Sequence, residues 1–262
     1  MAKQTDEVLQ VERDGPVTIA TINRPHRRNA LNGELTDALL AFFRAQRRDR
    51  ESKVIILRGS GDHFCVGADL IDAASEGSLS DGIDQGDWSV TEVTRDMRAC
   101  PQPIVALANG AVAGGGMAYA LAADIILASD TAFFCTAFMD IGLSGTELGV
   151  SWRLQRTMGL SLARELIFTS GRIAAQDAAN AGLVSRVVPA AELQAEGLAL
   201  AQRMARYTQD ALRLTKRNLD IALQSPLIEV AIELEERSQM RCVAKGDFSV
   251  ALAEFNARHA KS

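Results

Sequence analysis

The sequence predicts an α/β fold that continues into a region made of helices alone. In the first part of the chain, short apolar segments typical of buried strands alternate with glycine turns and helical patterns, as in stacked β and α units. From residue 150 onward, apolar residues recur at spacings of three and four, which favours helix after helix. The chain has 262 residues, which is enough for a substantial buried core.

The first elements are predicted to be a hairpin, a helix and a strand. Residues 8–23 alternate polar and apolar side chains on both sides of an Arg-Asp-Gly turn, which indicates a β-hairpin. A helix follows Asn32, whose side chain can cap the first turn. Residues 53–61, KVIILRGSG, are expected to form a short buried strand that ends in glycines.

The middle of the chain is expected to begin with a loop. Residues 71–94 contain no lysine or arginine and are rich in Ser, Gly and Asp, which predicts a loop that runs into a short helix. The next predicted elements are strand 103–110, helix 117–124 and strands 125–129 and 131–138.

The predicted C-terminal helices follow one another with a single interruption, the strand VSRVVP at 184–189. They cover residues 147–158, 161–170, 174–181, 191–206, 209–224, 227–244 and 249–260. No linker rich in proline or glycine separates the two halves, so the helices are expected to pack on the core or on a neighbouring subunit. We therefore divide the chain into residues 1–195 and 196–262.

Composition and charge exclude several classes of protein. The net charge is −5 and the basic residues form no single stripe, so nucleic acid is not an expected partner. The densest cluster, RPHRR at 24–28, leaves a local anionic ligand possible. Three histidines without ligand spacing and four widely spaced cysteines give no sign of a metal site or a disulfide framework. No apolar run is long enough to span a membrane and the N-terminus resembles no targeting peptide, so we expect a cytoplasmic protein.

Three consecutive glycines, Gly114 to Gly116, stand directly before the predicted helix 117–124. Each glycine inside a helix costs about 1 kcal/mol relative to alanine, so the triplet needs a reason. The glycines could let helix and strand approach closely, or they could bind a dinucleotide. The dinucleotide interpretation is disfavoured, because neither Tyr119 nor Tyr207 has the lysine four residues on that short-chain dehydrogenases need.

A third interpretation is that glycine amides at the helix N-terminus face a developing negative charge. The first N–H groups of a helix have no internal partner, and the helix dipole adds a positive field. One such donor can be worth about 3 kcal/mol to a transition state. Residues 59–70, another strand that ends in a glycine turn, could supply a second donor.

Five segments in this order resemble the enoyl-CoA hydratase/isomerase superfamily, the crotonases, over about residues 8–190. They are RPHRRNALN, HFCVGADL, NGAVAGGGMAYALAADIILAS, AFMDIGLSGTELGVSWRLQRTMG and LIFTSGRIAAQDAANAGLVSRVVP. The resemblance implies a spiral of β-β-α repeats with an acyl-CoA site in residues 1–195. It also implies that the helical region 196–262 serves oligomerisation, as a homotrimer or hexamer.

The resemblance also implies the parts of a site. The amides of Ala68 and Gly115 would form an oxyanion hole for the thioester carbonyl, Arg28 would contact a phosphate of coenzyme A, and the Ala30 backbone would lie near the pantetheine or adenine. Arg28 could equally be a solvated surface charge. No separate cofactor or metal is expected, since coenzyme A is part of the substrate, and the loop at 71–94 is expected to shape the acyl pocket. Further candidate substrate contacts are Val66, Asp69, Leu70, Tyr119 and Phe138, although Asp69 could instead bond turn backbone.

The catalytic acids depart from the hydratase pattern. Hydratases carry one glutamate two residues beyond the glycines and another before the following glycine turn, where this chain has Ala118 and Phe138. Glu147 matches a position that carries the functional acid in several isomerases and a dehalogenase, and its apolar neighbours are expected to raise its pKa. Glu147 could also be an ordinary helix N-terminal acid, and Asp140 is a weaker candidate.

A single acid favours isomerisation of a β,γ-unsaturated acyl-CoA to the α,β form. One group can take a proton from one carbon and return it two carbons away, whereas adding water usually needs two. A hydratase or acyl-CoA hydrolase that uses other residues stays open as an alternative. The loss of two acids also keeps open an acyl-CoA-binding protein with weak or no catalysis.

Overall fold

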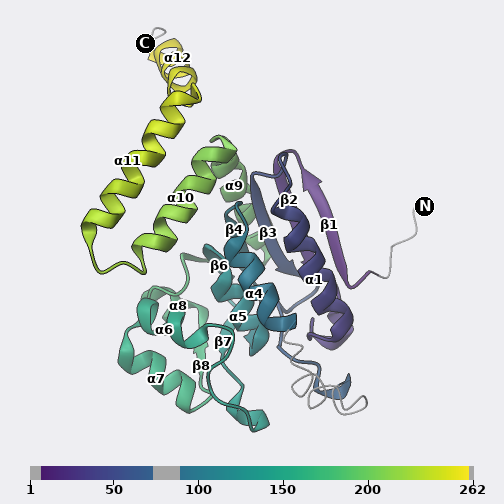
Figure 1. Ribbon diagram of the computed structural model, residues 1–262. Helices are drawn as coiled ribbons and strands as arrows, with labels where there is room; N and C mark the ends of the chain where they lie inside the picture. Colours follow the sequence, from purple (N-terminus) through teal and green to yellow (C-terminus); the bar gives the residue numbers. More distant parts are fainter. Residues whose placement is uncertain (1–6, 73–88, 260–262) are drawn as a thin grey trace, which may run out of the picture.

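The computed structural model describes residues 7–72 and 89–259, which form a six-stranded sheet with helices on both faces (Figure 1). The strand order is β1-β2-β3-β4-β6-β9, and β1 and β2 alone in this sheet run antiparallel. The predicted hairpin and the predicted strands at 53–61, 103–110, 125–129 and 184–189 are confirmed. The bounds are β1 Leu9–Asp14, β2 Val17–Ile22, β3 Val54–Gly59, β4 Ile104–Ala108, β6 Ile125–Ser129 and β9 Arg186–Val188.

A second, smaller sheet turns the chain into a spiral. It consists of β5 Ala111–Ala113, β7 Phe133–Cys135 and β8 Arg172–Ala174. Two isolated β-bridges involve earlier segments, one between Leu31 and Ala68 and one between Cys65 and Val112 of β5. Each turn of the spiral therefore passes through a long strand of the first sheet, a short paired segment of the second, and a helix. The fold is the predicted spiral of β-β-α repeats.

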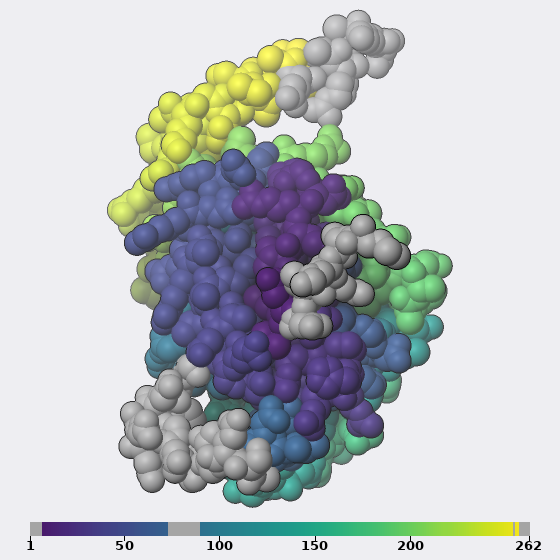
Figure 2. Space-filling view, turned by 90° about the vertical axis from the view of Figure 1, so that its right-hand side faces the viewer, coloured from purple at the N-terminus to yellow at the C-terminus, as the bar shows by residue number. Residues whose placement is uncertain are grey.

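Helices cover the large sheet because its inner strands β2, β3, β4 and β6 are mostly apolar and buried. One face packs on α1 Gly33–Gln46, α4 Ser89–Ala99 and α5 Gly115–Ala122, and the other on α9 Leu193–Ala205. Asn32 caps α1 as predicted, since its side-chain oxygen accepts a hydrogen bond from the Leu35 amide at 3.1 Å. In Figure 2 the purple hairpin and the blue residues that follow it form one continuous face of this core.

The remaining helices are α6 Val150–Met158, α7 Leu160–Phe168, α8 Ala175–Asn180, α10 Gln209–Ala222, α11 Ile228–Ala244 and α12 Asp247–His259, with short 3-10 turns η1 Pro25–Arg27, η2 Met139–Ile141 and η3 Ala190–Glu192. Of these helices, α6, α7 and α8 add side chains to the main core, and α10, α11 and α12 follow α9 in the chain. Figures 1 and 2 show α11 and α12 projecting away from the core, which leaves many of their apolar side chains exposed. The division of the chain at residue 195 stays a prediction.

Three predicted boundaries were wrong. The helix predicted for 147–158 begins at Val150, because Leu148 and Gly149 have φ of 54° and 85°, outside the helical range. The strand predicted for 131–138 is only β7, and the helix predicted for 117–124 already begins at Gly115. Residues 73–88 of the predicted loop lie outside the described residues, whereas residues 71–72 are helical and residues 89–94 belong to α4.

Candidate active site

The three glycines before α5 each have a different structural reason. Gly114 has φ 51° and ψ −125°, a conformation that side chains disfavour. Gly116 packs on backbone, because a Cβ there would lie against the Cys65 carbonyl and 2.7 Å from the Cys65 Cβ. Gly115 has a softer neighbour, since its Cβ would come 2.8 Å from the end of the Leu31 side chain. Close packing thus explains Gly116, while Gly115 is left with an amide at the helix N-terminus.

The turn at Gly67 and Ala68 lies directly against this helix N-terminus. A Cβ on Gly67 would be 3.2 Å from the Gly115 nitrogen, and Gly67 has φ 88°, which favours glycine. Neither the Ala68 amide nor the Gly115 amide donates a hydrogen bond to another described residue. The structure therefore brings together the two predicted donors, and the dipole of α5 adds positive potential beside them.

Glu147 belongs to the segment that passes close to Gly115. Its neighbour Leu148 reaches to within 3.9 Å of where a Cβ on Gly115 would be. The Glu147 side chain is half-buried, and desolvation raises its pKa. Glu147 lies two residues before the N-cap of α6, so it is not in the first turn of that helix. The expected rise of the Glu147 pKa is confirmed in direction.

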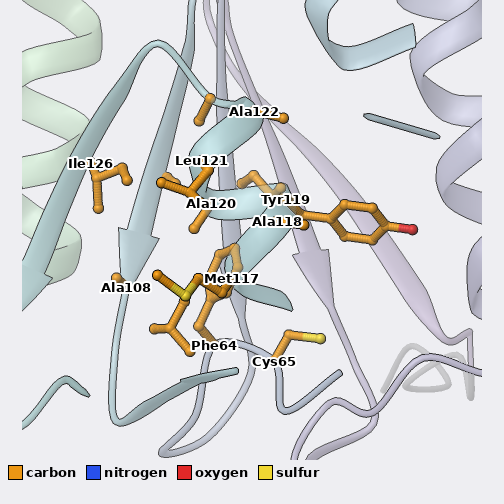
Figure 3. Close-up of a cluster of buried hydrophobic side chains, with 14 of the residues drawn as sticks. Phe64, Cys65, Ala108, Met117, Ala118, Tyr119, Ala120, Leu121, Ala122 and Ile126 are labelled. Carbon is orange, nitrogen blue, oxygen red and sulfur yellow. The ribbon is translucent and has the colours of Figure 1, made fainter. Parts of the chain in front are cut away.

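The positions of the two hydratase acids are apolar and buried. Ala118 and Phe138 are 1% and 4% exposed. Tyr119 is fully buried, and its hydroxyl donates to the Val90 carbonyl at 3.4 Å. Burial raises the Tyr119 pKa well above its usual value, and the charges of Cys65 and Glu147 add to this. Figure 3 shows the Tyr119 ring extending from one side of α5, away from Leu121 and Ile126. Neither of the two hydratase positions thus offers a carboxylate beside the triplet.

The basic segment 24–28 divides into outward and inward residues. Arg28 is exposed at the end of η1 with φ 52°, and no acidic side chain of the described residues pairs with it. Arg24 is buried and contacts the carboxylates of Asp69 and Asp72 at 3.0 and 3.1 Å. Sequence reasoning missed this role for Arg24, because its partners come more than 40 residues later. Arg28 is thus the arginine that stays accessible to a phosphate.

The remaining predicted contacts surround the Ala68 turn. Asp69 accepts hydrogen bonds from the amides of Ile71 and Asp72 at 3.2 and 3.3 Å, which supports its structural interpretation. Val66 is half-buried and Leu70 is 49% exposed. Ala30 is buried, and its carbonyl accepts from Arg24 at 2.6 Å. Each of these residues lies within two positions of Ala68 or beside the Leu31 bridge.

A cavity of about 610 Å³ borders the segment that holds Glu147. It includes Thr146 and Ser151 but neither of the two amides nor Glu147. Its walls come from the η2 region, α6 and α7, and its lining is Met139, Leu143, Ser144, Gly145, Thr146, Ser151, Gln155, Arg164, Ile167 and Phe168. This cavity is therefore separate from the candidate oxyanion hole.

The sequence profile described as enoyl-CoA hydratase/isomerase matches residues 12–260. The chain belongs to the enoyl-CoA hydratase/isomerase family. A Rhodobacter capsulatus protein of this family, named "Probable enoyl-CoA hydratase", is 33% identical over 247 residues, covering 94% of each chain. The crystal structure of an enoyl-CoA hydratase from Bacillus anthracis has a TM-score of 0.89 at 27% identity and covers 96% of each chain. A monofunctional enoyl-CoA isomerase from M. smegmatis has a TM-score of 0.74 at 32% identity, covering 86% of this chain and 98% of its own.

Members of the enoyl-CoA hydratase/isomerase family act on acyl-CoA thioesters, so the chain is an acyl-CoA enzyme of this family. The names of its relatives include both hydratase and isomerase. Among residues 7–72 and 89–259, no helix is long and apolar enough to cross a membrane. The same residues contain no cluster of His, Cys, Asp and Glu that could hold a metal ion.

Proposed function

We propose that this enzyme is an enoyl-CoA isomerase that moves a β,γ double bond into conjugation with the thioester. The amides of Ala68 and Gly115 hold the thioester carbonyl, and Glu147 carries the proton. One observation carries the proposal: Glu147 is a half-buried acid directly before Leu148, whose side chain lies near Gly115, while Ala118 and Phe138 occupy the positions of the hydratase acids.

The reaction begins at the carbonyl oxygen. When the oxygen accepts both amide hydrogen bonds, the negative charge that develops on proton loss is stabilised, by about 3 kcal/mol per donor in comparable sites. The Glu147 carboxylate then takes a proton from the α carbon, which leaves a dienolate spread over the carbonyl and the double bond. Return of the same proton to the γ carbon gives the conjugated product. The step needs no other reactant.

The environment of Glu147 fits this shuttle. A base is most effective when its pKa lies near the working pH, and burial moves the pKa of Glu147 upward from its usual value. Hydration would require a group that orients and activates water in addition to an acid. Because Ala118 and Phe138 cannot do this, hydration would depend on residues other than those of the hydratase pattern.

Two substrates separate the alternatives. Incubation with trans-3-enoyl-CoA should produce the ultraviolet absorbance of a conjugated thioester, whereas loss of that absorbance from trans-2-enoyl-CoA would identify a hydratase. The hydratase alternative has support of its own, because several relatives carry that name. Release of free thiol from a saturated acyl-CoA would identify a hydrolase. Tight binding with no turnover would favour an acyl-CoA-binding protein.

The role of Glu147 is tested with a matched control from the same segment. Glu147→Gln keeps the size of the side chain and should lose isomerase activity by at least about 10²-fold, within the range for loss of a general base. Asp140→Asn removes an exposed acid in η2 and should leave the rate unchanged. Full activity of Glu147→Gln would show that another group moves the proton.

We further propose that copies of this chain assemble in the cytoplasm as a homotrimer or hexamer. Support comes from large apolar side chains exposed on α11 and α12, among them Ile228, Ile232, Val243 and Phe248. Sedimentation equilibrium should give a mass of three or six chains, and a monomer at micromolar concentration would contradict the proposal. Exposed Arg28 is proposed to contact a coenzyme A phosphate, so Arg28→Met should raise the KM for acyl-CoA while changing kcat little.

A further inference from the structure

Arg24, just after β2, contacts both strands of the short bridge that contains Ala68. Its side chain is 8% exposed, and its Nη1 donates to the Ala30 carbonyl at 2.6 Å and lies 3.0 Å from Asp69 Oδ2. Its Nη2 donates to Asp72 Oδ2 at 3.1 Å. Ala30 precedes one side of the bridge and Asp69 follows Ala68 on the other. One guanidinium therefore connects the two strands.

The bridge fixes the peptide groups on both sides of Ala68. The Leu31 amide donates to the Gly67 carbonyl at 2.7 Å, and the Asp69 amide donates to the Leu31 carbonyl at 2.8 Å. The Ala68 N–H shares a planar peptide group with the Gly67 carbonyl, so the first of these hydrogen bonds sets its direction and the second holds the peptide that follows. A donor that is held in place before the substrate binds stabilises charge without reorganising.

Asp69 depends on Arg24 for its charge balance. The side chain is 3% exposed, its Oδ1 accepts two backbone amides, and within the described chain Oδ2 has the guanidinium as its partner. Burial raises the Asp69 pKa, but the Asp72 amide and Arg24 more than offset it, so the pKa lies below its usual value. A buried carboxylate that loses its cation is unfavourable. Loss of Arg24 would therefore disturb the residue directly after Ala68.

We propose that Arg24 is a positioning residue for the oxyanion hole. Through the Ala30 carbonyl and the Asp69 carboxylate it fixes the direction of the Ala68 amide, and thereby sets how strongly the enolate is held. The inference rests on the proposed function, since it takes the Ala68 amide as a donor to the substrate. Arg24 and Arg28 of the basic segment then have separate tasks, with Arg24 directed inward and Arg28 outward.

The test measures binding of acetoacetyl-CoA and of free coenzyme A. Acetoacetyl-CoA has an enolate form with its own ultraviolet band, and free coenzyme A has no thioester carbonyl. Arg24→Met should weaken enolate binding by at least about tenfold, less than the roughly 10²–10³-fold effect of removing a donor. It should lower kcat for the proposed isomerisation while changing KM little. The enolate affinity of Arg24→Lys should lie between those of wild type and Arg24→Met, because an ammonium group can pair with Asp69 but lacks the planar fork of a guanidinium.

Two further variants distinguish an effect on the oxyanion hole from a general loss of stability. Asp69→Asn keeps the shape of the partner and should weaken enolate binding in the same direction, and its effect should not add to that of Arg24→Met. Lys216→Met is the matched control, because it removes another buried cation from an aspartate, Asp124, at the opposite end of α5. It should lower the melting temperature but leave enolate binding unchanged.

The outcomes distinguish the inference from the proposed function. Equal enolate affinity in wild type and both Arg24 variants would overturn the positioning role. An equal loss in Lys216→Met would also overturn it, since stability alone would then explain the effect. Absence of an enolate band in the wild-type protein would overturn the oxyanion hole itself, and with it the proposed function.

Discussion

Alanine at each of the three glycines before α5 should give three different results. At Gly116 the new methyl would lie against the Cys65 carbonyl and 2.8 Å from its carbonyl carbon, and that carbonyl is held by the Ala113 amide at 2.9 Å. Backbone cannot move aside cheaply there, so Gly116→Ala should cost about 3 kcal/mol, the upper part of the range for overpacking. At Gly114 the cost comes from the positive φ and should be about 1–3 kcal/mol.

Gly115→Ala should behave differently. The methyl would meet only the end of the Leu31 side chain at 2.8 Å, which can shift, and alanine favours the helix by about 1 kcal/mol. Stability should therefore change by less than about 1 kcal/mol. The methyl also points between Leu31, Leu148 and Gly67, at the opening of the proposed hole, so kcat/KM for trans-3-enoyl-CoA should fall at least about tenfold.

Thermal melts and turnover with trans-3-enoyl-CoA measure both properties. In a protein of this size, about 1 kcal/mol corresponds to about 2–4 °C, so Gly116→Ala should melt roughly 6–12 °C below wild type. Gly115→Ala should melt within a few degrees of wild type and still be the less active enzyme per folded molecule. Full activity of Gly115→Ala, or a melting temperature as low as that of Gly116→Ala, would refute the separate roles of the glycines.

Three further predictions concern charge and capping. Burial raises the Glu147 pKa, so the folded protein binds the carboxyl proton more tightly than the unfolded chain does. The protonated carboxyl therefore contributes stability that is lost as the pH rises through the raised pKa. Glu147→Gln should thus be more stable than wild type above that pKa, and equal melting temperatures of the two proteins from about pH 4 to 8 would contradict this difference. The wild-type kcat/KM should rise with pH above the ordinary glutamate range. Lys216→Met breaks a 2.9 Å pair with Asp124 and should cost about 3 kcal/mol in urea unfolding, whereas a cost under about 1 kcal/mol would mean that the pair contributes little. Asn32→Ala should cost about 1 kcal/mol in the same measurement by removing the α1 cap, and no loss would show that water replaces it.

The parts of the fold that were predicted from sequence depend on local interactions. The hairpin and the cap at Asn32 involve residues that are close in the chain, and the long strands are buried on both faces. The short strands β5 and β8 were not predicted. Their partners lie about 20 to 40 residues away, and three residues give too little periodicity to detect.

The residues of the candidate site were proposed from the sequence, but some of the interactions that hold them in position were not. The pair Ala68 and Gly115 came from the resemblance, and the structure brings their turns together. The left-handed Leu148 that separates Glu147 from α6 has no local signal, because a non-glycine residue with positive φ is set by tertiary packing. In the sequence Arg24 belongs to the basic cluster at 24–28, and only the fold places Asp69 beside it.

The most direct test of the proposed chemistry is a crystal structure with a bound acyl-CoA. The thioester carbonyl oxygen should lie about 2.7–3.1 Å from both the Ala68 and Gly115 nitrogens, the range for oxyanion-hole donors. The Glu147 carboxylate should face the α and γ carbons of the acyl chain. A thioester carbonyl held by other groups, for example in the cavity lined by Met139 and Phe168, would contradict the assigned hole and the reaction derived from it.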